Sequence, residues 1–232
     1  GYLKMGEVQG ELYGPNADAR GNYERALGMA EALAARNPSS ESDAVLAARA
    51  NASMASLPHY QRALALLEPF AKSNPDGPPA QQQLEVSHRL GSLLYRSGDL
   101  PQALASYNRA YDIGARLMRA SPTNARAQRS MAAALQGMGE VYTHMGRVAG
   151  ALPKLTEALT ILERALDENP TQPRARHEVA MASLVLGDTL TAAGRHPEAV
   201  SAFRRALALM DELARTDGEN RQYRRDVPVA LG

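Results

Sequence analysis

The histidines and serines of the chain are the side chains that could support catalysis or metal binding. None of the histidines has the HExxH spacing or another spacing of metal ligands, and no GxSxG or SxxK motif is present to activate a serine. Cysteine is absent, which removes thiolate nucleophiles and cysteine metal ligands. The sequence therefore predicts no catalytic residue, no cofactor and no metal site. It predicts exposed or rim positions for the histidines, which are His59, His88, His144, His177 and His196.

Acidic and hydroxyl-bearing residues instead recur at a constant spacing. Ser92, Glu140 and Asp188 follow one another at the same interval, since 140−92 = 48 and 188−140 = 48. Like charges at stacked positions repel one another, and a cationic partner would relieve that repulsion. We predict a partner-binding set that consists of these recurring residues and the residues one helical turn before or after them. The set comprises Glu7, His88, Ser92, Tyr95, Gln136, Glu140, Thr143, Asp188 and Thr191.

A second set of recurring positions is basic. Cations near the N-terminus of a helix oppose the helix dipole, so helix stability does not account for them. Two interpretations are open: these residues contact a partner, or they form ion pairs between repeats with acids such as Asp167 and Glu168. The set comprises Arg126, Arg129, Arg174, Arg176, Arg224 and Arg225.

Both sets lie on copies of one unit of two helices. Gly139 and Gly146 recur 48 residues later and 48 residues earlier, since 187−139 = 48 and 139−91 = 48. Self-similarity at such a period is typical of a stacked array of repeats. In each full copy we expect a glycine such as Gly146 to close the first helix in the left-handed conformation. Small residues, such as Gly139 and Ala158, should let the two helices approach closely, with the large Leu155 beside them.

The repeats predict an all-α chain and a single array over residues 1–232. The second repeat is the poorest copy, with a short first helix at about 41–55 and a second helix that begins at the N-cap Ser56. The array begins and ends within helices, which predicts a segment cut from a longer polypeptide; the alternative is a capping helix at the C-terminus. The predicted repeats are about 1–37, 38–77, 78–122, 123–170, 171–218 and a partial copy at 219–232.

This pattern resembles the tetratricopeptide repeat (TPR) family. When Gly139 occupies the eighth position of the family's repeat, Ala151, Leu155 and Ala158 match its small, large and small positions 20, 24 and 27. The family's unit has 34 residues, and the longer period here is similar to the long-helix variants typified by kinesin light chains. The resemblance implies a right-handed superhelical solenoid whose first helices line a concave groove.

A narrower resemblance covers the first repeat. The stretch Gly6-Glu7-Val8-Gln9-Gly10, with Tyr13 and Asn16, is similar to the start of the TPR region that follows the kinase domain in some bacterial serine/threonine protein kinases. The resemblance implies a regulatory or sensor region of such a kinase. The segment itself has no kinase motif.

Composition narrows the function further. The 26 basic and 25 acidic side chains give a net charge of +1, which provides no bulk attraction to nucleic acid or to a membrane surface. No apolar run approaches the roughly 18 residues that a membrane-spanning helix needs.

We therefore expect a non-catalytic scaffold that binds a protein or peptide of basic character in the concave groove. The alternatives are the kinase-linked sensor and a helical-repeat nucleic-acid binder. The compartment, cytoplasmic or on the extracytoplasmic side of a membrane-anchored bacterial protein, is not determined by the sequence.

Overall fold

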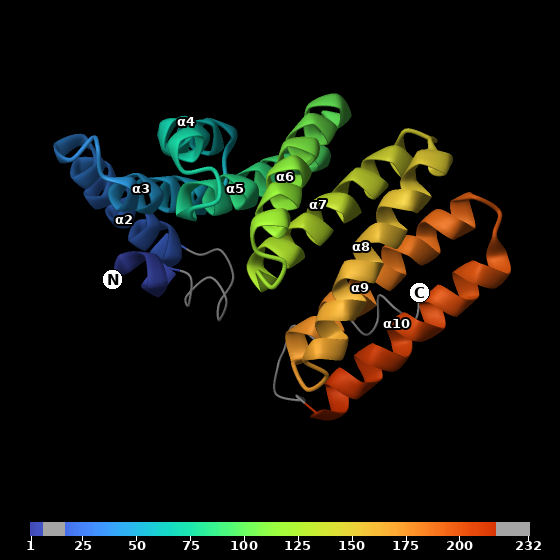
Figure 1. The fold of residues 1–232 in the computed structure, drawn as a ribbon. Helices are drawn as coiled ribbons and strands as arrows, with labels where there is room; N and C mark the ends of the chain where they lie inside the picture. Colours follow the sequence, from blue (N-terminus) through green and yellow to red (C-terminus); the bar gives the residue numbers. More distant parts are fainter. Residues whose placement is uncertain (7–16, 217–232) are drawn as a thin grey trace. The chain divides into compact units, whose positions relative to one another are not determined.

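The computed structural model describes residues 1–6 and 17–216, and their regular structure is entirely helical (Figure 1). Two compact units, Gly1–Pro122 and Thr123–Gly232, make up the chain. The all-α prediction is confirmed. The helices are α2 (Ala17–Arg36), α3 (Glu41–Ser53), α4 (Leu57–Ser73), α5 (Pro78–Arg96) and α6 (Leu100–Ala120) in the first unit, and α7 (Ala125–His144), α8 (Val148–Glu168), α9 (Pro173–Ala192) and α10 (His196–Thr216) in the second.

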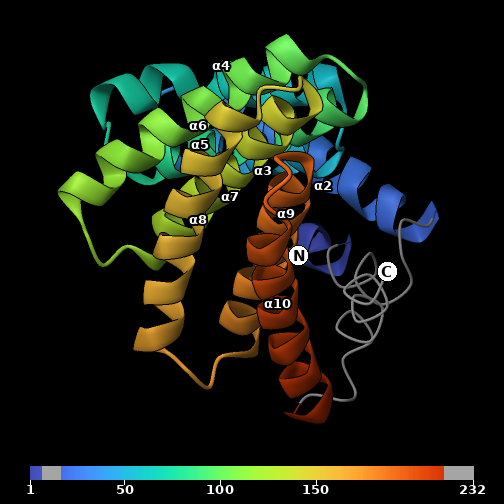
Figure 2. The same ribbon diagram turned by 90° about the vertical axis from the view of Figure 1, so that its right-hand side faces the viewer.

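Consecutive helices pair as hairpins within each unit. In the second unit α7 packs on α8, α9 on α10, and α8 also contacts α9, as Figures 1 and 2 show. In the first unit α5 packs on α6 and on α4, while α3 packs on α2 and α4. Helix α3 has 13 residues, against 20 in α7, as expected for the poorest repeat. It ends at Ser53, which is two residues before the expected end. Helix α4 follows the predicted N-cap Ser56.

The predicted glycine turns close three of the first helices. Gly98, Gly146 and Gly194 have positive φ angles of 84°, 71° and 72°. The residue after each glycine donates its backbone N–H to the carbonyl five residues earlier, as in the bond of 2.9 Å from Asp99 to Leu94. This pattern is the Schellman closure, which needs a residue that tolerates the left-handed conformation. Asp99 then caps α6 by accepting a hydrogen bond of 3.2 Å from the Gln102 N–H.

In the three full repeats the two helices of the hairpin cross where a glycine faces a large side chain. A Cβ atom on Gly139 would lie 2.5 Å from Leu155, and one on Gly91 would lie 2.7 Å from the ring of Tyr107. Ala158 is fully buried at the same crossing. The expected close approach is therefore present, and its detail is more specific than expected: the glycine makes room for the large side chain itself.

An ion pair that recurs between neighbouring second helices was not predicted. Its acid lies eight residues after the large residue of one second helix, and its arginine lies two residues after the large residue of the next. At the corresponding places of the third and fourth repeats the sequence has Ala115 and Glu157, which cannot form this pair. The pairs are Glu31–Arg62 at 3.8 Å, Glu68–Arg109 at 2.7 Å and Glu163–Arg205 at 2.8 Å.

Candidate functional site

The predicted acidic positions of the second unit lie on its first helices, α7 and α9. Glu140 is half-buried on α7 and Asp188 is exposed on α9. The two helices are joined close to these acids by a hydrogen bond of 3.0 Å between the hydroxyls of Thr143 and Thr189. Because Thr189 is buried, this bond fixes α7 against α9 at the level of the acids. We call the surface formed by Gln136, Glu140, Thr143, Asp188 and Thr191 the acidic face.

The carboxylates of the acidic face are in an unfavourable electrostatic environment. Burial raises the pKa of Glu140 above its ordinary value, and the negative charge of Asp188 raises it further. Loss of solvent also raises the pKa of Asp188. Neither carboxylate has an ion-pair partner among residues 1–6 and 17–216. The acidic face therefore has the like-charge interaction that the sequence spacing predicted, with no cation of the described chain to offset it.

The remaining side chains of the acidic face are polar neighbours of these acids. Thr143 donates its hydroxyl to the Gly139 carbonyl at 2.9 Å, and Thr191 donates its hydroxyl to the Gly187 carbonyl at the same distance. Such bonds to the preceding helical turn hold threonine side chains in one orientation. Gln136 is half-buried one turn before Glu140.

In the first unit the corresponding residues of α5 are largely occupied by internal contacts. The hydroxyl of Tyr107 donates to Ser92 at 3.2 Å, and Ser92 donates to the His88 carbonyl at 3.2 Å. The His88 ring lies 5.8 Å from the Tyr107 ring, between centroids. Burial lowers the pKa of His88 to about 4, with a further decrease from the positive charge of Arg89. His88 is half-buried, so it lies at a rim position as expected for the histidines, and its ring packs against Tyr107 of α6. Tyr95 is half-buried on the same helix.

The basic set of the second unit forms ion pairs. Arg174 pairs with Glu178 at 2.8 Å, and Arg129 of α7 reaches the same carboxylate of α9 at 3.9 Å. Arg176 pairs with Glu212 of α10 at 3.8 Å. Of these pairs, only Arg129–Glu178 joins two repeats, as the ion-pair interpretation expected, whereas Arg174 and Arg176 pair within their own repeat. The acids are Glu178 and Glu212 in place of Asp167 and Glu168. Arg126 is exposed on α7.

Three predicted site residues lie outside the described residues, namely Glu7, Arg224 and Arg225. Within the described part of the chain, no group of three or more His, Asp or Glu side chains is arranged to hold a metal ion. No described helix is both long enough and apolar enough to cross a membrane.

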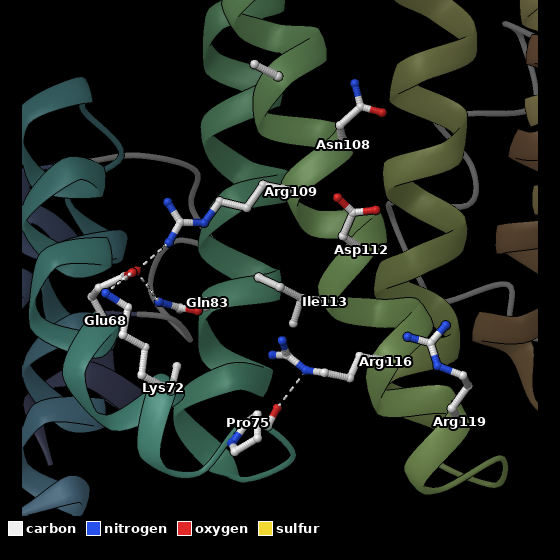
Figure 3. A pocket seen from close by; sticks show the side chains of 12 residues that line it. Glu68, Lys72, Pro75, Gln83, Asn108, Arg109, Asp112, Ile113, Arg116 and Arg119 are labelled. Carbon is white, nitrogen blue, oxygen red and sulfur yellow. Dashed lines mark hydrogen bonds and ion pairs between the residues drawn. The ribbon is translucent and has the colours of Figure 1, made fainter.

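Sequence reasoning missed a furrow between the second helices α4 and α6 of the first unit (Figure 3). Its volume is about 630 Å³, and cations line it from both helices. They have no motif spacing, because Lys72 and Arg116 lie 44 residues apart on different helices (116−72 = 44). Only the packing of α4 and α6 on α5 brings them together.

Comparison with known families agrees with this architecture. Two family models described as tetratricopeptide repeat match residues 57–125 and 130–212, which together are about two thirds of the chain. The chain belongs to the tetratricopeptide repeat family. Its TPR hairpins have first and second helices of about 20 residues in the full repeats, which accounts for the period of 48. A search of curated proteins gave no match.

Solved structures with a similar fold include BtubC (BKLC) from P. vanneervenii, at 17% identity and a TM-score of 0.62 over 94% of this chain and 91% of that one. TTC0263, a thermophilic TPR protein of Thermus thermophilus, has 21% identity and a TM-score of 0.49 over 99% and 97% of the two chains. A putative kinesin light chain from Podosopora anserina has 16% identity and a TM-score of 0.47 over 93% and 96%. The similarity to BtubC concerns the fold alone.

Proposed function

We propose that the acidic face of the second unit binds a basic segment of a protein partner. TPR proteins are in general scaffolds for protein–protein interactions, and this chain has their helical hairpins. The observation that carries the proposal is the pair Glu140 and Asp188, two carboxylates of neighbouring first helices whose pKa values are raised and whose charges have no described counter-ion. For the first unit taken by itself, the half-buried ring of Tyr95 on α5 is proposed as an aromatic contact, since aromatic rings often anchor interfaces.

Packing requirements do not account for these acids. The equivalent position of the first unit is Ser92, so the hairpin tolerates an uncharged residue there. A lysine or arginine of a partner would offset the repulsion between the carboxylates, and charge-assisted hydrogen bonds to carboxylates are stronger than neutral ones. The acidic face should therefore favour association with cationic segments and should lose that preference as the salt concentration rises.

The test uses a fluorescently labelled hexalysine peptide and the whole chain at low and at physiological salt. The variant Glu140→Gln with Asp188→Asn should bind the peptide about tenfold more weakly, mostly through slower association, and with a flatter salt dependence. The matched control, Asp167→Asn with Asp211→Asn, changes two exposed acids of the same unit and alters the net charge equally. If the two double variants bind hexalysine with equal affinity, the acidic face is an ordinary solvated surface and the proposal is wrong.

A further inference from the structure

The furrow between α4 and α6 lies on the second helices, so it is separate from the acidic face of the first helices. Its floor includes the buried side chains of Ala71 and Ile113 and the buried amide of Gln83 from α5. Four cations, Lys72, Arg109, Arg116 and Arg119, line it against two carboxylates, Glu68 and Asp112. A volume of about 630 Å³ lies within the range of about 300–1,000 Å³ that is typical of ligand sites.

The furrow already holds one carboxylate of the chain. Glu68 accepts a hydrogen bond of 2.7 Å from Arg109 and one of 3.1 Å from Gln83, and it lies 3.3 Å from Lys72. The hydrogen bond with Lys72 and the charge of Arg109 lower the pKa of Glu68. A single carboxylate therefore serves three donors, and the furrow retains positive charge that Glu68 does not neutralise.

Arg116 has unused donor capacity inside the furrow. It points from α6 towards α4, and its Nε donates to the Pro75 carbonyl at 3.2 Å and lies 3.9 Å from Asp76 (Figure 3). The two terminal nitrogens of its guanidinium have no partner among the described residues of the chain. A planar guanidinium with both terminal nitrogens open can bind a carboxylate in the bidentate geometry.

The repeats supply an internal comparison that separates packing from binding. The position of Lys72, twelve residues after the large residue of its helix, is Asp167 in α8. The position of Arg116, nine residues after Tyr107, is Glu212 in α10. The ion pair Glu68–Arg109 recurs between these two helices as Glu163–Arg205, so it belongs to the fold. The cations of the α4–α6 pair, Lys72 and Arg116, are replaced by acids in the α8–α10 pair.

From these observations we propose that the furrow between α4 and α6 binds an acidic peptide segment of a protein partner, with Lys72 and Arg116 as its principal contacts. Lys72 of α4 and Arg116 of α6 line the furrow from its two sides, so one acidic segment that lies in the furrow can contact both cations. The apolar floor at Ala71 and Ile113 accommodates the aliphatic parts of the same segment.

The probe for the test is a fluorescently labelled hexaglutamate peptide, titrated with the whole chain at about 50 mM salt. Lys72→Gln with Arg116→Gln should weaken its binding about tenfold or more, because charge-assisted contacts are lost. The matched control, Arg164→Gln with Arg204→Gln, removes two exposed cations of α8 and α10 and makes the same change in net charge. The control should bind hexaglutamate within about twofold of the parent chain. Hydrogen exchange should show protection by the peptide in α4 and α6.

Several results would overturn the proposal. Equal weakening in both double variants would mean that hexaglutamate responds only to bulk charge. Absence of binding to the parent chain, or protection confined to helices other than α4 and α6, would remove the furrow as the site. Tighter binding of a hexathymidylate oligonucleotide, lost in the Lys72 and Arg116 variant, would assign the furrow to nucleic acid and contradict a peptide ligand. Thermal melts of both variants verify that the units remain folded.

Discussion

The crossing of α7 and α8 allows a sharp test of how the repeat packs, with Gly139→Ala as the perturbation. The new Cβ would lie 2.5 Å from Cγ and from Cδ2 of Leu155. Cγ is the branch point of the leucine, so a change of rotamer at the end of the side chain cannot clear it. Leu155 is only 1% exposed, which leaves no solvent-filled space into which it could move. Overpacking of this kind costs about 1–3 kcal/mol.

A second effect opposes the first, because alanine is favoured over glycine in a helix by up to about 1 kcal/mol. The control Gly150→Ala, in α8 of the same hairpin, provides this gain without the clash. A Cβ there would meet nothing closer than Tyr142 at 3.7 Å, an ordinary contact distance. The difference in unfolding free energy between the two variants should therefore be about 1–3 kcal/mol, with Gly139→Ala the less stable.

The assay is urea unfolding monitored by pulsed hydrogen exchange and mass spectrometry of peptides from α7 and α8, which reports this hairpin separately from the first unit. In a thermal melt, the same difference should lower the transition of Gly139→Ala by at least about 4 °C relative to the control. Adding Leu155→Ala should recover part of the loss, since contacting residues couple in their effects. The reasoning is refuted if Gly139→Ala and Gly150→Ala have the same midpoint.

Three further predictions concern the site and the weakest repeat. The folded-state pKa values of Glu140 and Asp188 are raised, so the folded state gains stability as these carboxyls bind protons. At pH 7 the parent should therefore be less stable than the variant Glu140→Gln with Asp188→Asn. The urea midpoints of the two proteins should converge as the pH falls towards the ordinary carboxyl pKa values of 4.5 and 3.8. A difference that stays constant with pH would contradict the shared repulsion. The ring of His88 should titrate by NMR near pH 4, and a midpoint at 6.5 would show that its imidazole is solvated. Amides of α3 should exchange before those of α7, because the buried face of α3 is made of alanines and one asparagine, whereas α7 buries Met131 and Leu135 among others; equal protection would contradict this.

The features that could be predicted from the sequence are those that every repeat must satisfy. The glycine turns and the close approach of Gly139 to α8 depend on residue types that recur at an interval of 48, so several copies in the sequence reveal them. The ion pair Glu68–Arg109 also recurs, but its members belong to neighbouring repeats and lie 41 residues apart. A search within one unit does not find it. The ion-pair partners of Arg129 and Arg176 depend on which acids the packing of α9 and α10 brings near them. From the sequence alone, Asp167 and Glu168 were equally reasonable partners.

The contact of His88 with Tyr107 shows the other limit of sequence reasoning. Its stacked position matched Gln136, which suggested a ligand-facing side chain. The large residue opposite it is Tyr107 in this repeat and Leu155 in the next, and only the tyrosine offers a ring and a hydroxyl for His88 and Ser92 to contact. A difference at one packing position therefore changes what its neighbours can do.

Comparison between repeats separates the residues that packing requires from those that it leaves free. A residue type shared by the full copies, such as the glycine at the crossings of Gly91, Gly139 and Gly187, is explained by the hairpin. At Glu140 and Asp188 two copies carry an acid where the copy in α5 carries Ser92. The α8–α10 pair carries Asp167 and Glu212 where the α4–α6 pair carries Lys72 and Arg116. The fold is formed with either choice, so stability does not select these charges. Packing of the repeat therefore does not explain two surfaces of opposite charge. One is the acidic face on the first helices of the second unit, and the other is the furrow on the second helices of the first unit.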